Sequence, residues 1–251
     1  MNLRIASYNI SRCETYEDFI PGNDTPRPIC IDRTAEALKK IDADFFCLNE
    51  AYVEGKKIEL QAQPEKIASL TQREHVAFAK GFSFPWGTIG NAIISKYPIL
   101  ETERIPVPAP AEKDRRENET EWYEDRAILR ALIEAEGRRI TFITTHFGLN
   151  GLEHENMVKA LTSLIDRTCT PILLAGDFNV LPHADVLQPI YDRLTSAADA
   201  ANNTDFTFST FCPDRTIDYI FYSEAFTLLN YKVYPVATSD HFPVYADLML
   251  R

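Results

Sequence analysis

Eight short apolar runs recur along the chain, each with the length and the β-branched or aromatic content of a strand. They cover residues 3–10, 44–50, 91–100, 127–135, 139–147, 171–179, 216–223 and 242–250. The runs at 127–135 and 139–147 are joined by the tight connection Glu136-Gly137-Arg138, which is typical of an antiparallel hairpin. A purely parallel sheet is therefore disfavoured, and the pattern predicts mixed sheets.

Helical periodicity separates several of these runs. Residues 32–43 and 151–167 each repeat apolar positions at three- and four-residue spacing, which predicts amphipathic helices. Residues 64–75 and 184–194 are weaker candidates, and Pro189 should kink or restart the second of them. Strands covered on one side by helices and on the other by further strands form a layered α/β sandwich, which is the architecture that this order predicts.

Length and composition predict that residues 1–251 form a single domain. The chain is 45% hydrophobic and long enough for a large core, and its 9 glycines form no linker tract. Residues 106–123 begin proline-rich and become strongly charged, so we expect a long surface loop beside the site or an insertion. The five cysteines are scattered without a CxxC pair, which disfavours a disulfide framework and a structural zinc site.

Charge and hydropathy narrow the possible partners. A net charge of −11 argues against a protein that binds nucleic acid by bulk counterion release, although a local basic groove remains open. No apolar run approaches membrane-spanning length and the first residues resemble no secretory leader, so we expect no membrane partner and a cytoplasmic location. The sequence does not indicate an oligomeric state, and a monomer is assumed.

Polar residues stand at or beside the ends of several apolar runs: Asn9, Glu50, His146, Asp177, Asn179 and the pair Asp240-His241. On a strand, Asp177 and Asn179 would share a face and could point at one target. Taken singly, each of these residues is better explained as a turn or capping residue. Together they indicate a site, because acids at neighbouring strand ends could share a divalent cation that offsets their desolvation.

Eight segments, in order along nearly the whole chain, resemble the endonuclease/exonuclease/phosphatase family: ASYNI, LNE, GNAIISKYPI, EDRAIL, TTHF, AGDFNV, TIDYIF and SDHFPV. The resemblance implies a deoxyribonuclease-I-like fold, a four-layer α/β/β/α sandwich of two packed mixed sheets with the site at one edge. It does not identify the branch. The abasic-site endonucleases carry an aspartate two residues after the asparagine that matches Asn9, and this chain has Ser11 there, which weakens the case for that branch.

The resemblance also implies a metal site and a catalytic pair. Glu50 matches the main ligand of a divalent cation, and Asn9, which also matches a substrate-binding position, completes the metal site together with Asp240. Oxygen ligands of this kind suit Mg²⁺ or Mn²⁺. His241 resembles the catalytic histidine, and Asp218 resembles the carboxylate that orients it.

Four further residues match positions that contact the phosphate ester. Asp177 and Asn179 match the pair that handles the attacking water or the leaving oxygen and binds the phosphate. His146 matches a second catalytic histidine that contacts phosphate, and Arg126 matches a further phosphate ligand. Whether Asp177 or His241 takes the first proton stays open.

Hydrolysis of a phosphate ester needs an activated water, charge cancelled on the phosphoryl oxygens and a stabilised leaving oxygen, and these residue types supply all three. The leading hypothesis is a divalent-metal-dependent phosphoesterase that cleaves phosphodiester bonds of nucleic acid as an endo- or exonuclease. Trp86, Phe147, Phe208 and Phe211 could stack on bases, although Phe147 and Phe208 suit the core equally well.

Two alternatives remain. The first is a phosphatase of a small phosphorylated metabolite or of a sugar or inositol phosphate, because the basic pairs at 115–116 and 138–139 are better explained as solvated than as phosphate-binding. The second is a catalytically silent member of the fold that binds a phosphorylated ligand or a protein, and it ranks lower because every metal and histidine position is filled. A serine hydrolase is disfavoured because the chain has no GxSxG motif.

Overall fold

The computed structural model describes residues 1–16, 27–55, 62–85 and 87–251, and within them the strands form two six-stranded mixed sheets. The first sheet has the order β11-β12-β1-β2-β4-β3. Its strands are β1 (Asn2–Asn9), β2 (Phe45–Gly55), β3 (His75–Phe84), β4 (Gly87–Ser95), β11 (Phe226–Val233) and β12 (Val244–Leu250). The second sheet has the order β5-β6-β7-β8-β10-β9. Its strands are β5 (Ile99–Val107), β6 (Arg126–Ala135), β7 (Arg138–His146), β8 (Ile172–Asp177), β9 (Thr195–Ser196) and β10 (Asp218–Tyr222).

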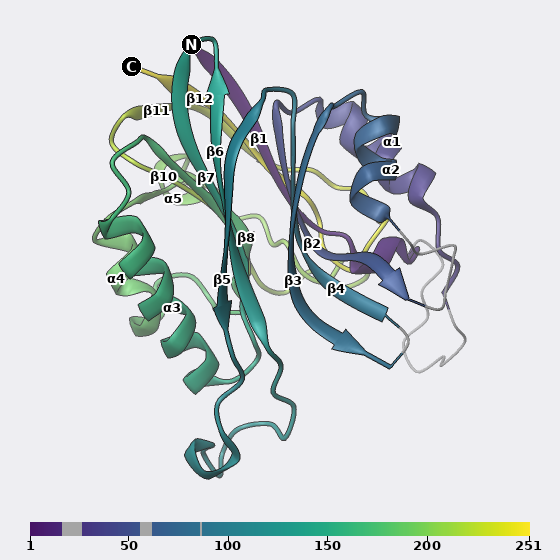
Figure 1. Cartoon of the computed structure of the whole chain (residues 1–251), viewed down its shortest axis with the longest axis vertical. Helices are drawn as coiled ribbons and strands as arrows, with labels where there is room; N and C mark the ends of the chain where they lie inside the picture. Colours follow the sequence, from purple (N-terminus) through teal and green to yellow (C-terminus); the bar gives the residue numbers. More distant parts are fainter. Residues whose placement is uncertain (17–26, 56–61, 86) are drawn as a thin grey trace.

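Helices cover the outer faces of both sheets (Figure 1). On the first sheet lie α1 (Ile31–Ile41) and α2 (Gln63–Leu70), and on the second lie α3 (Gly151–Asp166) and α4 (Gln188–Tyr191), while α5 (Ala197–Ala200) follows β9. This arrangement confirms the expected four-layer α/β/β/α sandwich. No helix in the described parts of the chain is both long and apolar enough to cross a membrane.

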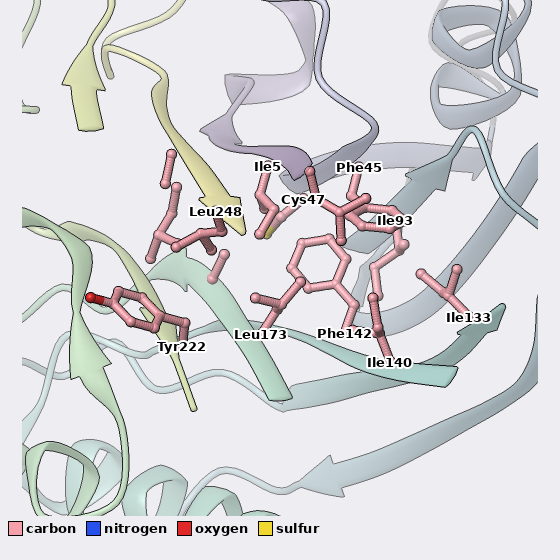
Figure 2. Close-up of a cluster of buried hydrophobic side chains, with 14 of the residues drawn as sticks. Ile5, Phe45, Cys47, Ile93, Ile133, Ile140, Phe142, Leu173, Tyr222 and Leu248 are labelled. Atoms are coloured by element: carbon pink, nitrogen blue, oxygen red, sulfur yellow. The ribbon is translucent and has the colours of Figure 1, made fainter. Parts of the chain in front are cut away.

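The largest apolar cluster fills the space between the two sheets. Figure 2 shows Ile5 and Phe45 of the first sheet against Phe142 and Leu173 of the second, all of them fully buried. Each such side chain stabilises the fold by about 1.5–3 kcal/mol through removal from water. The core therefore holds the sheets face to face, and their polar strand ends come together at one edge.

The structure corrects several element predictions. The run at 91–100 is not one strand, because the Lys96-Tyr97-Pro98 segment interrupts it and separates β4 from β5, which lie in different sheets. The strands β3 and β11 were not recognised, since their exposed and buried positions mix without clean alternation. At Pro189 the predicted restart is confirmed, because the residue lies in the first turn of α4, where a missing N–H costs nothing.

Candidate active site

The predicted polar residues converge at one end of the sandwich. The parallel register of β7 and β8 sets His146 opposite Asp177, and the antiparallel register of β8 and β10 sets Asp218 opposite Asp177. Every predicted site residue except Asp218, which is buried behind His241, lines a cleft of about 390 Å³: Asn9, Glu50, Arg126, His146, Asp177, Asn179, Asp240 and His241. Residues far apart in the chain thus share one cavity because neighbouring strands end at the same edge.

His241 forms a buried pair with a carboxylate. Its Nδ1 donates to Asp218 Oδ2 at 2.9 Å, and its Nε2 lies 3.6 Å from Asp177 Oδ2. Burial opposes the imidazolium, but Asp218 and Asp177 outweigh that effect and raise the pKa of His241 to about 10. Burial also raises the pKa of Asp177 to about 7, against the attraction of His241. His241 and Asp177 therefore form a pair in which the charge of one group changes the proton affinity of the other.

His146 has the opposite kind of partner. Its Nδ1 lies 3.0 Å from Arg126 Nη1, and the guanidinium is held in turn by Glu124 at 2.7 Å. A guanidinium cannot accept a hydrogen bond, so Nδ1 must be the acceptor and the ring proton must be on Nε2. That nitrogen lies 3.4 Å from Asp177 Oδ2. Burial, followed by Arg126, lowers the pKa of His146 well below its ordinary value, so the ring is a neutral N–H donor facing the cleft.

A buried network of side-chain amides holds the backbone of Asp177 and links the two sheets. Asn49 Oδ1 accepts from the Asp177 N–H at 3.0 Å, and Asn49 Nδ2 donates to Asn91 Oδ1 and to the Thr145 carbonyl at 2.9 Å each. Asn91 in turn donates to a backbone carbonyl of β6 at 2.8 Å. Gly176 is also needed here, because a Cβ at that residue would lie 2.0 Å from the Thr145 carbonyl oxygen. Asp177 is therefore positioned by contacts from both sheets.

Glu50 reaches the cleft through an irregularity in β2. The register with β4 shifts between Leu48 and Ala51, and Glu50 has a φ of 55°, so its side chain leaves the regular alternation of the strand. Asn9 Nδ2 donates to Glu50 Oε1 at 3.2 Å and to Asp177 Oδ2 at 3.0 Å. Asn9 Oδ1 accepts from a backbone N–H at 3.1 Å. Asn9 thus bridges the two carboxylates with its amide nitrogen.

Comparison with known proteins identifies the family of this chain. The model of the endonuclease/exonuclease/phosphatase family matches residues 6–241. The chain belongs to this family. Its members hydrolyse phosphoester bonds and generally depend on a divalent metal.

One sequence relative and two solved structures resemble this chain at low identity, and the solved structures share its fold. The uncharacterised protein YbhP of Escherichia coli is 24% identical over 163 residues, which cover 61% of this chain and 60% of that protein. An endonuclease/exonuclease/phosphatase from Beutenbergia cavernae is 23% identical with a TM-score of 0.78, covering 99% of this chain and 72% of that one. The mannosyl-6-phosphatase Bt3783 of Bacteroides thetaiotaomicron is 16% identical with a TM-score of 0.75, covering 99% and 100%. The chain matches less than two thirds of the length of YbhP.

The donor set in the cleft suits the hard divalent cation on which this family depends. Glu50 is partly buried, and its pKa is raised by burial and then by Asp240, which lines the same wall. A cation bound between these carboxylates would relieve both the desolvation and the mutual repulsion. Among the described residues, Asp177, Asp218 and His241 also present atoms within 4.8 Å of one another that could hold a metal. That second set shares no residue with Glu50, Asn9 and Asp240.

One geometric expectation was wrong. Asp177 and Asn179 do not share a strand face, because β8 ends at Asp177 and Asn179 has a left-handed φ of 49°. They meet through a turn instead, in which the Asn179 N–H donates to Asp177 Oδ1 at 2.9 Å. Asn179 Nδ2 also donates to the Phe147 carbonyl at 3.1 Å, so its amide still faces the cleft.

The charged excursion at 106–123 lies beside the site. Thr120 donates through its backbone N–H to Asn150 Oδ1 at 2.8 Å, and Glu119 accepts from the backbone N–H of Leu152 at 2.9 Å. These contacts dock the excursion on the first turn of α3 and bring Trp122, which is exposed, to the rim of the cleft.

The aromatic residues proposed for stacking separate into different environments. Phe147 is fully buried and packs on Phe178, so it belongs to the core. Phe208 lines the cleft with its ring centroid 4.8 Å from that of His241, whereas Phe211 is exposed away from the cleft lining. Trp86 lies outside the described residues.

Sequence reasoning missed the groups that support the site. Asn49 and Asn91 stand inside two of the family-like segments, LNE and GNAIISKYPI, and a polar amide in an apolar run was the available signal. Glu124, which pairs with Arg126, begins a third such segment, EDRAIL, and that position was the available signal. Arg12 also lines the cleft and pairs with Glu14 at 3.0 Å, and no pattern in the sequence indicated this role.

Proposed function

We propose that this protein hydrolyses phosphodiester bonds with the help of Mg²⁺ or Mn²⁺, and that nucleic acid is the first substrate class to test. The observation that carries the proposal is the convergence of Asp177 with His241 and its buried partner Asp218 on the wall of the cleft that also presents Glu50. This arrangement provides a base, an acid and a place for a hard cation within reach of one phosphoryl group.

In the proposed reaction, water attacks phosphorus, the P–O ester bond breaks, and the leaving oxygen takes up a proton. Asp177 is the group proposed to accept the proton of the attacking water, since its raised pKa makes it a stronger base than an ordinary aspartate. The imidazolium of His241, held by Asp218, is proposed to stabilise the phosphoryl oxygens or to protonate the leaving oxygen. The metal, held by Glu50 with Asp240 and Asn9, would supply Lewis-acid stabilisation of the phosphoryl charge.

His146, Asn179 and Arg126 are proposed as the substrate-binding side of the same cleft. The Nε2–H of His146 and the amide of Asn179 are neutral donors that can contact phosphoryl oxygens. Arg126 lines the cleft as well, although its guanidinium is already engaged by Glu124 and His146. Its contribution to phosphate binding would therefore be shared with its role in orienting His146.

A phosphatase of a small phosphorylated molecule is the second candidate, and two observations favour it. The cleft lining carries Glu50, Glu124, Asp177 and Asp240 beside only Arg12 and Arg126 among the described residues, which is a poor track for a polyanion. The chain is also similar in fold to a mannosyl-6-phosphatase.

One assay separates these functions. Purified protein with Mg²⁺, Mn²⁺ or a chelator is incubated with single- and double-stranded DNA, RNA, bis-p-nitrophenyl phosphate, p-nitrophenyl phosphate and a set of sugar phosphates. We expect metal-dependent cleavage of diesters, abolished by Asp177→Asn and unaffected by the matched change Asp192→Asn at an exposed position on the protein surface. Turnover of monoesters alone would establish the phosphatase, and silence on all substrates would favour a ligand-binding role.

A further inference from the structure

A second pocket continues the catalytic cleft past Asn179. Its volume is about 590 Å³, and it shares Leu149, Asn179 and Phe208 with the cleft. Leu181, Asp214, Arg215 and Ile217 complete its lining. The two cavities therefore adjoin along these three residues, and we refer to them together as the groove, with the proposed phosphoryl site in its first part.

The strand order places this pocket on the far side of the reacting groups. Arg126 begins β6, His146 ends β7, Asp177 ends β8, and Ile217 directly precedes β10, in that spatial order across the sheet. Three strand spacings of about 4.8 Å separate β6 from β10, or about 14 Å. Phe82 and Phe84 lie on β3, which packs against β5 and β6, and Trp122 precedes β6, so this aromatic rim lies on the β6 side of the phosphoryl site and the second pocket lies on the β10 side.

The lining of the second pocket is mainly apolar and solvent-accessible. Leu149 is 54% exposed and Leu181 is 56% exposed, which is unusual for two leucines beside the same cavity. Ile217, which also lines this pocket, is buried. The Arg215 guanidinium lies 5.4 Å from the centroid of the Phe208 ring and is paired with Asp214 at 2.6 Å, so the rim carries little net charge. Such a surface suits an apolar or planar group and does not suit a second phosphate.

We propose that this pocket, bounded by Leu149, Leu181, Ile217 and Phe208, binds the second organic group of a phosphodiester, an apolar or planar group esterified to the same phosphorus. The inference rests on the proposed phosphoesterase function and specifies its substrate class. A monoester would fill the phosphoryl site and one arm of the groove only. A diester fills both arms, and the apolar contact at Leu181 adds to its binding.

The test uses Leu181, because it lines the second pocket without lining the catalytic cleft and its exposure makes its replacement tolerable for folding. Steady-state kinetics of the parent, Leu181→Asp and Leu181→Phe are measured on bis-p-nitrophenyl phosphate and p-nitrophenyl phosphate with saturating Mg²⁺. The matched control is Leu229→Asp, since Leu229 is 51% exposed on β11 and lines neither cavity.

We expect Leu181→Asp to raise KM for the diester on the order of tenfold, because it replaces apolar contact by a desolvated carboxylate, and to leave KM for the monoester within about twofold. Leu181→Phe should keep or lower KM for the diester, and Leu229→Asp should change neither substrate. Equal changes on both substrates, no change on either, or a parent that hydrolyses monoesters alone would overturn the inference while leaving a phosphoesterase in place. A parent inactive on both substrates would instead refute the proposed function and the inference with it.

Discussion

His241 and His146 flank the same oxygen of Asp177 but have opposite partners. His241 Nε2 lies 3.6 Å from Asp177 Oδ2 and has the Asp218 carboxylate behind it, whereas His146 Nε2 lies 3.4 Å from the same oxygen and has the Arg126 guanidinium behind it. Both rings are buried, and burial lowers the pKa of each. The partners then act in opposite directions: Asp218 and Asp177 outweigh burial and raise the pKa of His241, whereas Arg126 adds to the lowering that burial already causes at His146. His241 thereby provides a charged hydrogen-bond donor, and His146 provides a neutral one.

The largest effect on activity is expected from removing the carboxylate that pairs with His241. Asp218→Asn leaves His241 without its carboxylate, so the pKa of His241 should fall and kcat should drop roughly 10³-fold. Imidazole titration by NMR and steady-state kinetics measure the two quantities. A variant with kcat within a few-fold of the parent would contradict the role proposed for the pair, and circular dichroism checks that the variant is folded.

Removing the guanidinium that pairs with His146 should have a smaller effect on activity. In Arg126→Met the guanidinium is gone, so His146 can take up a proton more readily, and its pKa should rise while kcat/KM falls roughly 10- to 100-fold. Arg130→Met is the matched control, because Arg130 lies on the same strand and pairs weakly with Glu101 at 3.7 Å outside the cleft. If the pKa of His146 stayed unchanged in Arg126→Met, Arg126 would not be setting its protonation state.

The pH dependence of kcat/KM should report the protonation of Asp177. A base must be deprotonated to act, so kcat/KM should fall about tenfold for each pH unit below the pKa of Asp177. Burial raises that pKa to about 7, and a bound cation favours the carboxylate, so raising the Mg²⁺ concentration should move this acid limb to lower pH. His146 should add no further limb above this one, since its pKa is well below the ordinary value. An activity that is flat through pH 7 and insensitive to Mg²⁺ would exclude Asp177 as the base.

The smallest effect should come from Glu124→Gln. This change keeps the shape of the side chain that holds Arg126 at 2.7 Å but removes its charge, so Arg126 should remain near His146 with less restraint. We expect kcat/KM to fall about two- to fivefold, as for the loss of one charge-assisted hydrogen bond at the edge of a site. A loss as large as that of Arg126→Met would mean that Glu124 contacts the substrate directly.

Much of the fold was accessible from the sequence because it follows from local patterns. Alternating and continuous apolar runs identified most core strands, the Gly137 connection identified the β6–β7 hairpin, and apolar repeats identified α1 and α3. The strands β3 and β11 escaped because they are the two edge strands of the first sheet, and their many partly exposed positions dilute the apolar pattern. The break within 91–100 escaped because an apolar pattern does not say which sheet a strand joins.

By itself, the sequence determined which chemical groups are present and that they stand at or beside the ends of apolar runs, since residue type and local periodicity are properties of the chain alone. Only the tertiary structure decided which groups meet. The registers of β7, β8 and β10 bring His146, Asp177 and Asp218 together, and the amides of Asn49 and Asn91 hold the backbone of the second sheet, including the N–H of Asp177. The protonation of each histidine follows from its neighbour in space, because electrostatic interaction depends on distance in three dimensions and not on separation along the chain.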